Sequence, residues 1–292
     1  MTNILNNHDI SKHIITFSDK SYLSFCINKD IHSIYTKTNK PKNTINLLEY
    51  AIPSGDLTRI KYLFDNYHNQ LQTYKLCFIA VKYGLFDCLK YLHENGCTFG
   101  PMICEIAIKG GHLDCLKYLI ENGCPWNEDI CMQTAAQNGH LDCLKYLYEK
   151  GCPWDIYTCS NAASGGNLEC LKYLHENGCP WDSNTTRCAA TNIDCLKYAY
   201  ENGCNLDDYT CYVAARNGNI ECLKYAYENG CPWDEWTCSC AARNGNIECL
   251  KYLHENGCPW NEITLKNAFD NDNIECLNYA IENKCIGYKK YI

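Results

Sequence analysis

The sequence predicts an all-α fold, a solenoid of about nine helix-turn-helix repeats with a period of about 27 residues. Two observations predict it: one tetrapeptide recurs at nearly constant spacing, and most copies are followed by the same helix-ending Asn-Gly. Cys-Leu-Lys-Tyr begins at Cys88, Cys115, Cys143, Cys170, Cys195, Cys222 and Cys249, and Cys-Leu-Asn-Tyr begins at Cys276. The successive steps are 27, 28, 27, 25, 27, 27 and 27 residues.

The first helix of a typical unit, residues 231–257, is predicted to run from Glu235 to Arg243. Asp234 can cap it by accepting hydrogen bonds from the free N–H groups of the first turn. Asn244 and Gly245 end it, because glycine readily adopts the left-handed conformation that closes a helix.

The second helix is predicted from Ile247 to Glu255, capped by Asn246 and ended by Asn256-Gly257. Apolar residues three apart, with Cys249 beside them, give this helix one buried stripe. The Cys-Pro-Trp that follows connects to the next unit, because proline cannot continue a helix. Helix pairs this short cannot bury both faces alone, so neighbouring units are expected to stack.

Composition excludes several classes of function. The chain has 292 residues, 46% of them hydrophobic, and a formal net charge of −8. Acidic charge argues against nucleic acid, and no apolar run approaches the ~20 residues that cross a bilayer. Met1–Ile10 lacks the apolar core of a signal peptide. We therefore expect a cytoplasmic monomer with no catalytic constellation and no cofactor.

The string AARNGNIECLKYLHENG, residues 241–257, resembles the core of an ankyrin repeat. The resemblance covers roughly residues 42–285 and is poorer in the first helix, where Trp236 to Ser239 replace the usual Thr-Pro-Leu-His. It implies protein binding on a concave face lined by first helices, and the shortened period implies short or absent hairpin fingers. The Cys-Pro-Trp motif is similar to that of repeats encoded by giant amoeba-infecting DNA viruses. That resemblance implies host proteins as partners.

The repeat array is predicted over residues 42–285, followed by a tail at 286–292. Nine candidate units are marked by Ala51, Ala80, Ala107, Ala135, Ala162, Ala189, Ala214, Ala241 and Ala268. The 25-residue step arises where Ala190-Thr191-Asn192 lacks a glycine pair. We expect a tighter turn and a local irregularity in the stack there.

Residues 1–41 do not repeat, and two interpretations stay open. The segment can form a helical cap over the first repeat, which the pattern favours. It also resembles a degenerate F-box, although it lacks the leucine-proline opening. That resemblance implies a ubiquitin-ligase adaptor as partner, and the chain would then select substrates for a cullin-type ligase.

The 25 cysteines recur at fixed repeat positions and include no Cys-x-x-Cys pair. Zinc sites usually offer ligands two to four residues apart, so we interpret the cysteines as small core residues. A remote alternative is a metal protein or enzyme. A second recurring position carries Trp126, Trp154, Trp181, Trp233 and Trp260, which predicts a packed aromatic ladder under the loops.

Positions that differ between repeats are candidates for partner recognition. Two residues before the marker alanine stand Phe78, Glu105, Gln133, Ser160, Arg187, Tyr212, Ser239 and Lys266. Two residues after it, on the same helical face, stand Lys82, Lys109, Gln137, Ser164, Arg216, Arg243 and Asp270. Aromatic residues and Arg commonly anchor interfaces, so the predicted partner-binding set is Tyr209, Tyr212, Arg216, Trp236, Arg243, Tyr157 and Arg187.

Overall fold

A computed structural model describes residues 52–67 and 73–292 of the chain. Within those residues all regular structure is helical, as the sequence predicts, and no helix there is long and apolar enough to cross a membrane. The segment 1–41 and the marker residue Ala51 lie outside the described part. The chain divides into two compact units, one ending at Trp126 and the other spanning Asn127–Ile292.

The first unit contains two complete helix pairs preceded by a single helix in the second-helix position. Its elements are η1 (Ile52–Ser54), α5 (Leu57–Tyr67), α6 (Thr73–Lys82), α7 (Phe86–Glu94), α8 (Ile103–Lys109) and α9 (Leu113–Glu121).

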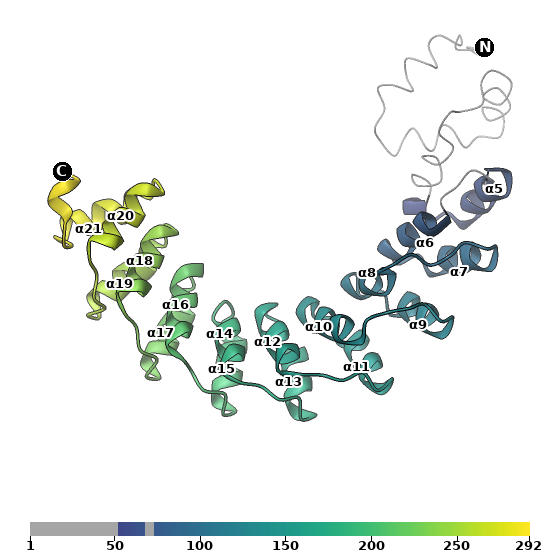
Figure 1. Ribbon diagram of the computed structural model, residues 1–292, viewed down its shortest axis with the longest axis horizontal. Coiled ribbons are helices and arrows are strands. Elements are labelled where there is room, and N and C mark those ends of the chain that lie inside the picture. Colours follow the sequence, from purple (N-terminus) through teal and green to yellow (C-terminus); the bar gives the residue numbers. More distant parts are fainter. Residues whose placement is uncertain (1–51, 68–72) are drawn as a thin grey trace, which may run out of the picture. The chain divides into compact units, whose positions relative to one another are not determined.

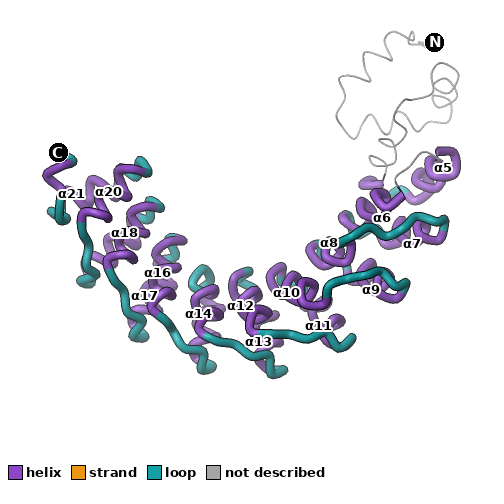
Figure 2. The backbone as a smooth tube through the Cα atoms, viewed as in Figure 1, coloured by secondary structure: helices purple, strands orange, loops and turns teal. Residues whose placement is uncertain are grey.

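The second unit contains six helix pairs and a terminal turn. Its first helices are α10 (Glu128–Asn138), α12 (Ile156–Ser164), α14 (Ser183–Ala189), α16 (Asp208–Asn217), α18 (Glu235–Arg243) and α20 (Glu262–Asp270). Its second helices are α11 (Leu141–Glu149), α13 (Leu168–Glu176), α15 (Ile193–Glu201), α17 (Ile220–Glu228), α19 (Ile247–Glu255) and α21 (Ile274–Glu282), followed by η3 (Tyr288–Lys290). This unit is curved, and the first helices form the row on its inner side (Figure 1). Short loops join each pair to the next (Figure 2).

Local signals place the ends of α18 and α19 where the sequence predicts them. The Asp234 carboxylate accepts hydrogen bonds from the backbone N–H groups of Trp236 (3.0 Å) and Thr237 (3.1 Å). Gly245 adopts a φ of +74°, in the left-handed region that a side chain would disfavour. These bounds follow from neighbouring residues alone, which is why they are visible in the sequence.

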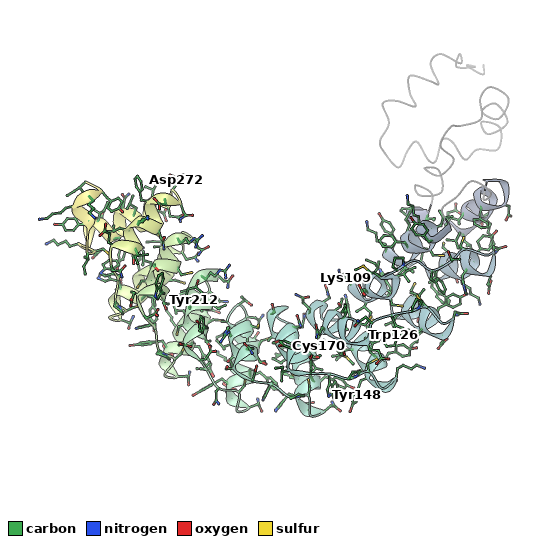
Figure 3. All side chains as sticks on the ribbon, in the orientation of Figure 1. Lys109, Trp126, Tyr148, Cys170, Tyr212 and Asp272 are labelled. Atoms are coloured by element: carbon green, nitrogen blue, oxygen red, sulfur yellow. The ribbon has the colours of Figure 1, made fainter. Side chains whose placement is uncertain are left out.

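The core of the stack is built from small residues and sulfur. Cys238 and Ala241 of α18 are fully buried, and so are the cysteine and leucine that open each Cys-Leu-Lys-Tyr, as at Cys249 and Leu250. Figure 3 shows Cys170 at the corresponding place inside the stack. The prediction that the cysteines serve as small core residues therefore agrees with their burial.

The prediction that Asn246 caps the second helix is wrong. Its side chain makes no capping bond to α19. Instead its amide nitrogen donates to the carbonyl oxygens of Ala215 (2.9 Å) and Arg216 (2.8 Å), at the end of the preceding first helix. Asn167 and Asn273 make the same pair of bonds one repeat back. This asparagine therefore joins neighbouring repeats by donating to the last carbonyls of a first helix, where intrahelical donors run out.

The repeat with the 25-residue step has the tighter turn that the sequence predicts. The N–H of Asn192 bonds the carbonyl of Ala189 at 2.8 Å, whereas in the regular unit Asn246 bonds Ala241, two residues further back. Asn192 then caps α15 by accepting from the Cys195 N–H at 3.0 Å. The next repeat is also altered, since Asn219 reaches one carbonyl, that of Thr191, rather than two.

Candidate protein-binding surface

Two exposed aromatic side chains stand in the first turns of neighbouring first helices. Tyr209 of α16 is 53% exposed and Trp236 of α18 is 56% exposed. Each lies two residues after the aspartate that precedes its helix, Asp207 or Asp234. The capped first turn thus fixes the backbone beneath each ring and directs the ring away from the core.

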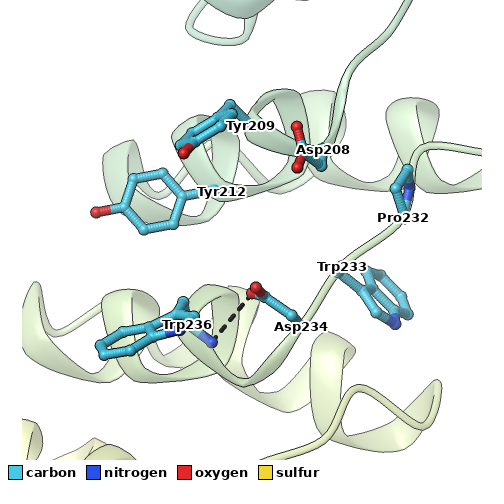
Figure 4. A pocket seen from close by; sticks show the side chains of 7 residues that line it. All are labelled: Asp208, Tyr209, Tyr212, Pro232, Trp233, Asp234 and Trp236. Atoms are coloured by element: carbon cyan, nitrogen blue, oxygen red, sulfur yellow. Dashed lines mark hydrogen bonds between the residues drawn. The ribbon is translucent and has the colours of Figure 1, made fainter.

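A pocket of about 580 Å³ opens between these two helices. It is lined by Asp208, Tyr209, Tyr212, Pro232, Trp233, Asp234 and Trp236. Figure 4 shows Tyr212 on one side and Trp236 on the other, with the two carboxylates towards the space between the helices. The rings of Tyr209 and Tyr212 meet edge to face, with centroids 6.3 Å apart, a favourable aromatic geometry.

Two cations lie close to the half-buried Tyr212. A side-chain hydrogen bond with Cys240 raises the pKa of the Tyr212 hydroxyl, and the charges of Arg216 and Arg243 oppose that rise. Both arginine side chains are exposed, and neither forms an ion pair with the residues that the structure describes. Five residues predicted from sequence, Tyr209, Tyr212, Arg216, Trp236 and Arg243, are therefore brought together on α16 and α18.

The other two predicted residues are placed differently. Arg187 of α14 pairs with Asp207 and stacks over the Tyr209 ring, 4.6 Å from its centroid. It therefore supports the surface from the side. Tyr157 of α12 is 57% exposed but lies two repeats before α16. It extends the same row of helices rather than joining the pocket.

Variation between repeats does not by itself mark an exposed position. Ser160 and Ser239 are buried, and their hydroxyls donate to the carbonyls of Tyr157 and Trp236 within their own helices. Glu105 is also buried. The residue type two before the marker alanine can differ between repeats because of packing, as where a small hydroxyl side chain fits a tight helix contact. The expectation that this position faces a partner is therefore wrong at these residues.

The recurring tryptophans form the predicted ladder, half-buried rather than covered. Trp233 stacks on Tyr227 at 3.5 Å between centroids and meets Tyr252 of the next unit edge to face at 6.1 Å. Trp260 stacks on His254, whose Nδ1 lies 2.9 Å from the Tyr279 hydroxyl. Pocket residue Trp233 is thus fixed in place by the ladder. The described side chains include no group of three or more His, Cys, Asp or Glu that could hold a metal ion.

Two family models match parts of the chain. The model described as "Ankyrin repeats (3 copies)" matches residues 76–158, and "Ankyrin repeats (many copies)" matches residues 211–254. Among solved structures, the human ASB11 ankyrin repeat domain aligns with 24% identity and a TM-score of 0.45, covering 53% of this chain and 84% of that one. Among curated proteins, none matches. The viral resemblance and the F-box-like segment stay predictions. The family models confirm ankyrin repeats within residues 76–158 and 211–254.

Proposed function

We propose that the chain is a protein-binding scaffold whose partner docks on the first-helix surface of α16 and α18. Ankyrin repeats generally mediate binding to protein partners. The observation that carries the proposal is the gathering of Tyr209, Tyr212 and Trp236 around one pocket, with Arg216 and Arg243 farther along the same two helices. Aromatic residues and Arg supply most of the binding free energy in protein interfaces.

The same surface adds little to the stability of the fold. Tyr209 and Trp236 are exposed and bury little area, and Arg216 and Arg243 are exposed and form no ion pair with the described residues. The core of the same repeats consists of different residues, among them Cys238 and Ala241. Binding and folding therefore rest on separate side chains and can be separated by substitution.

The test uses peptides selected from a random displayed library on the full chain. The double change Tyr212→Ala and Arg216→Ala should weaken their binding at least ~10-fold, the size of a hot-spot loss of about 1.4 kcal/mol. The melting temperature should change by less than about 3 °C, because neither Tyr212 nor Arg216 belongs to the buried core.

The matched control is Tyr83→Ala, which removes a ring of similar exposure, 49%, from the first unit. It should leave binding unchanged. If the double variant lost both peptide affinity and melting temperature, Tyr212 and Arg216 would be shown to pack in the fold rather than to contact the peptide. Unchanged binding in the double variant would show that the peptides dock elsewhere.

A further inference from the structure

The pocket between α16 and α18 combines two kinds of wall. Tyr209, Tyr212, Trp233 and Trp236 supply aromatic surface, and Asp208 and Asp234 supply carboxylates. Aromatic faces attract cations through their negative quadrupole, and carboxylates attract them by charge. This pairing disfavours an anion and gives a neutral group no electrostatic gain.

Both carboxylates retain capacity for a ligand. The bonds from Trp236 N–H, Thr237 N–H and the Thr237 hydroxyl all reach the Oδ1 atom of Asp234, and no described donor reaches Oδ2. Asp208 is exposed and forms no ion pair with the described residues. A cation in the pocket would therefore meet two oxygen acceptors without breaking the helix cap.

The chain already holds a cation in the same way beside this pocket. Arg187 places its guanidinium 4.6 Å from the Tyr209 ring centroid while it pairs with Asp207. One face of the Tyr209 ring therefore already binds a cation within the fold. Along the outer row, Lys224 lies 5.4 Å from the Tyr252 centroid, in a similar contact between repeats.

This arrangement is specific to one place in the stack. The position of Tyr209 and Trp236 is occupied in successive described repeats by Lys75, Met102, Ile130, Tyr157, Asn184, Tyr209, Trp236 and Ile263. Within that row the aromatic pair on neighbouring repeats is Tyr209 and Trp236. The aromatic pair is therefore a local feature of these two repeats and not a consequence of the repeat pattern.

We propose that this pocket receives a Lys or Arg side chain from the partner polypeptide. The proposal rests on the protein-binding function proposed above and names the chemistry that the partner presents. A volume of about 580 Å³ exceeds what one ion needs and lies within the range of sites that take an organic group. Arg216 and Arg243 lie about two helical turns along α16 and α18, roughly 10 Å from the pocket end of each helix at 1.5 Å per residue. They suit an acidic residue of the same partner segment.

The experiment determines the sequence preference of the selected peptides and then changes one charge at a time. The selected peptides should share one Lys or Arg. Replacing it with norleucine or citrulline should weaken binding to the unaltered chain ~10-fold, as expected for a contact of about 1.4 kcal/mol.

The chain variant is Asp208→Asn with Asp234→Asn, which keeps the helix cap because Asn caps as well as Asp. It should bind the basic peptide ~10-fold less tightly, and the norleucine peptide should then bind almost as well as the basic one. The control, Asp142→Asn with Asp194→Asn, makes the same change in net charge at exposed positions on the second helices α11 and α15, outside the pocket. It should leave both affinities unchanged.

Two results distinguish failure of the cation pocket from failure of the proposed protein-binding function. Peptides that need Tyr212 and Arg216 but bind equally well with norleucine would overturn the cation pocket and leave the binding surface intact. Peptides that ignore both the aspartates and the Tyr212→Ala, Arg216→Ala change would overturn both. Selection of acidic peptides that depend on Arg216 would also overturn the cation pocket.

Discussion

The cysteines of this chain do more than fill space. In the Cys-Pro-Trp link, the thiol of Cys231 donates to the carbonyl of Asp207 at 2.9 Å, one link back. Cys204 bonds Asp182 in the same way, also at 2.9 Å. The same two carbonyls also accept the backbone N–H groups of Thr210 (3.0 Å) and Thr185 (2.8 Å), so the thiol adds a second bond that a valine could not make. Sulfur at this position therefore both packs and joins neighbouring links. The sequence reveals the packing role alone, because the acceptor lies 22 to 24 residues away.

The buried thiols make stability sensitive to alkaline pH. Burial raises the pKa of Cys249 from 9.0 to about 11 and that of Cys222 to about 12. Above pH 9 the unfolded chain releases these protons while the folded chain retains them. The stabilisation is therefore complete below pH 9 and is lost as the pH rises towards 11, by up to about 1.4 kcal/mol per pH unit for each such thiol.

Urea unfolding between pH 8 and pH 10.5 measures this loss. The free energy of unfolding should be steady to about pH 8.5 and then fall steeply. In the control Cys249→Ala the free energy of unfolding should be lower at every pH, because a core side chain is truncated. Its decline with pH should be less steep, because one buried thiol fewer contributes to it. A free energy of unfolding that stays level to pH 10.5 would contradict the burial of the thiols.

At the scale of one element, the asparagine before the second helix has two roles, and Asn219 combines them by donating to the Thr191 carbonyl and accepting from the Cys222 N–H. Asn246 joins two repeats through its amide donors, whereas Asn192 caps its own helix through its carbonyl oxygen. The tight turn at Thr191 explains the difference, since it leaves Asn192 with an extended backbone that suits a cap. Cap and inter-repeat bond require the same residue type, so the sequence does not distinguish them.

The substitution Asn→Asp separates these roles, because Asp caps as well as Asn but has no amide donors. Asn246→Asp should lower the free energy of unfolding by about 1–3 kcal/mol, because the Arg216 carbonyl loses its donor, the Ala215 carbonyl keeps only the Gly218 N–H, and both then face a carboxylate. Asn192→Asp should change it by less than about 0.5 kcal/mol. Urea unfolding at pH 7 measures both, and equal effects would refute the inter-repeat role of Asn246.

Across the whole molecule, sequence comparison between repeats predicts the fold well and the surface only in part. Helix ends such as the one at Gly245 depend on local residues, and similar residues recur at the helix ends of most units. The pocket depends on Tyr209 and Trp236 standing side by side on neighbouring first helices, which requires the stacking geometry. Ser160 and Ser239 mislead for the same reason, since their burial is set by neighbouring packing rather than by residue type.

The central claim is that the exposed first-helix surface of α16 and α18 binds the partner, while buried side chains of the same repeats, such as Cys238 and Ala241, hold the stack together. Hydrogen exchange of the full chain, with and without a selected peptide, tests it most directly. Binding should slow exchange across residues 207–217 and 234–243 and leave α17 and α19 unchanged. Slowing confined to α17 and α19, with α16 and α18 unaffected, would contradict the claim.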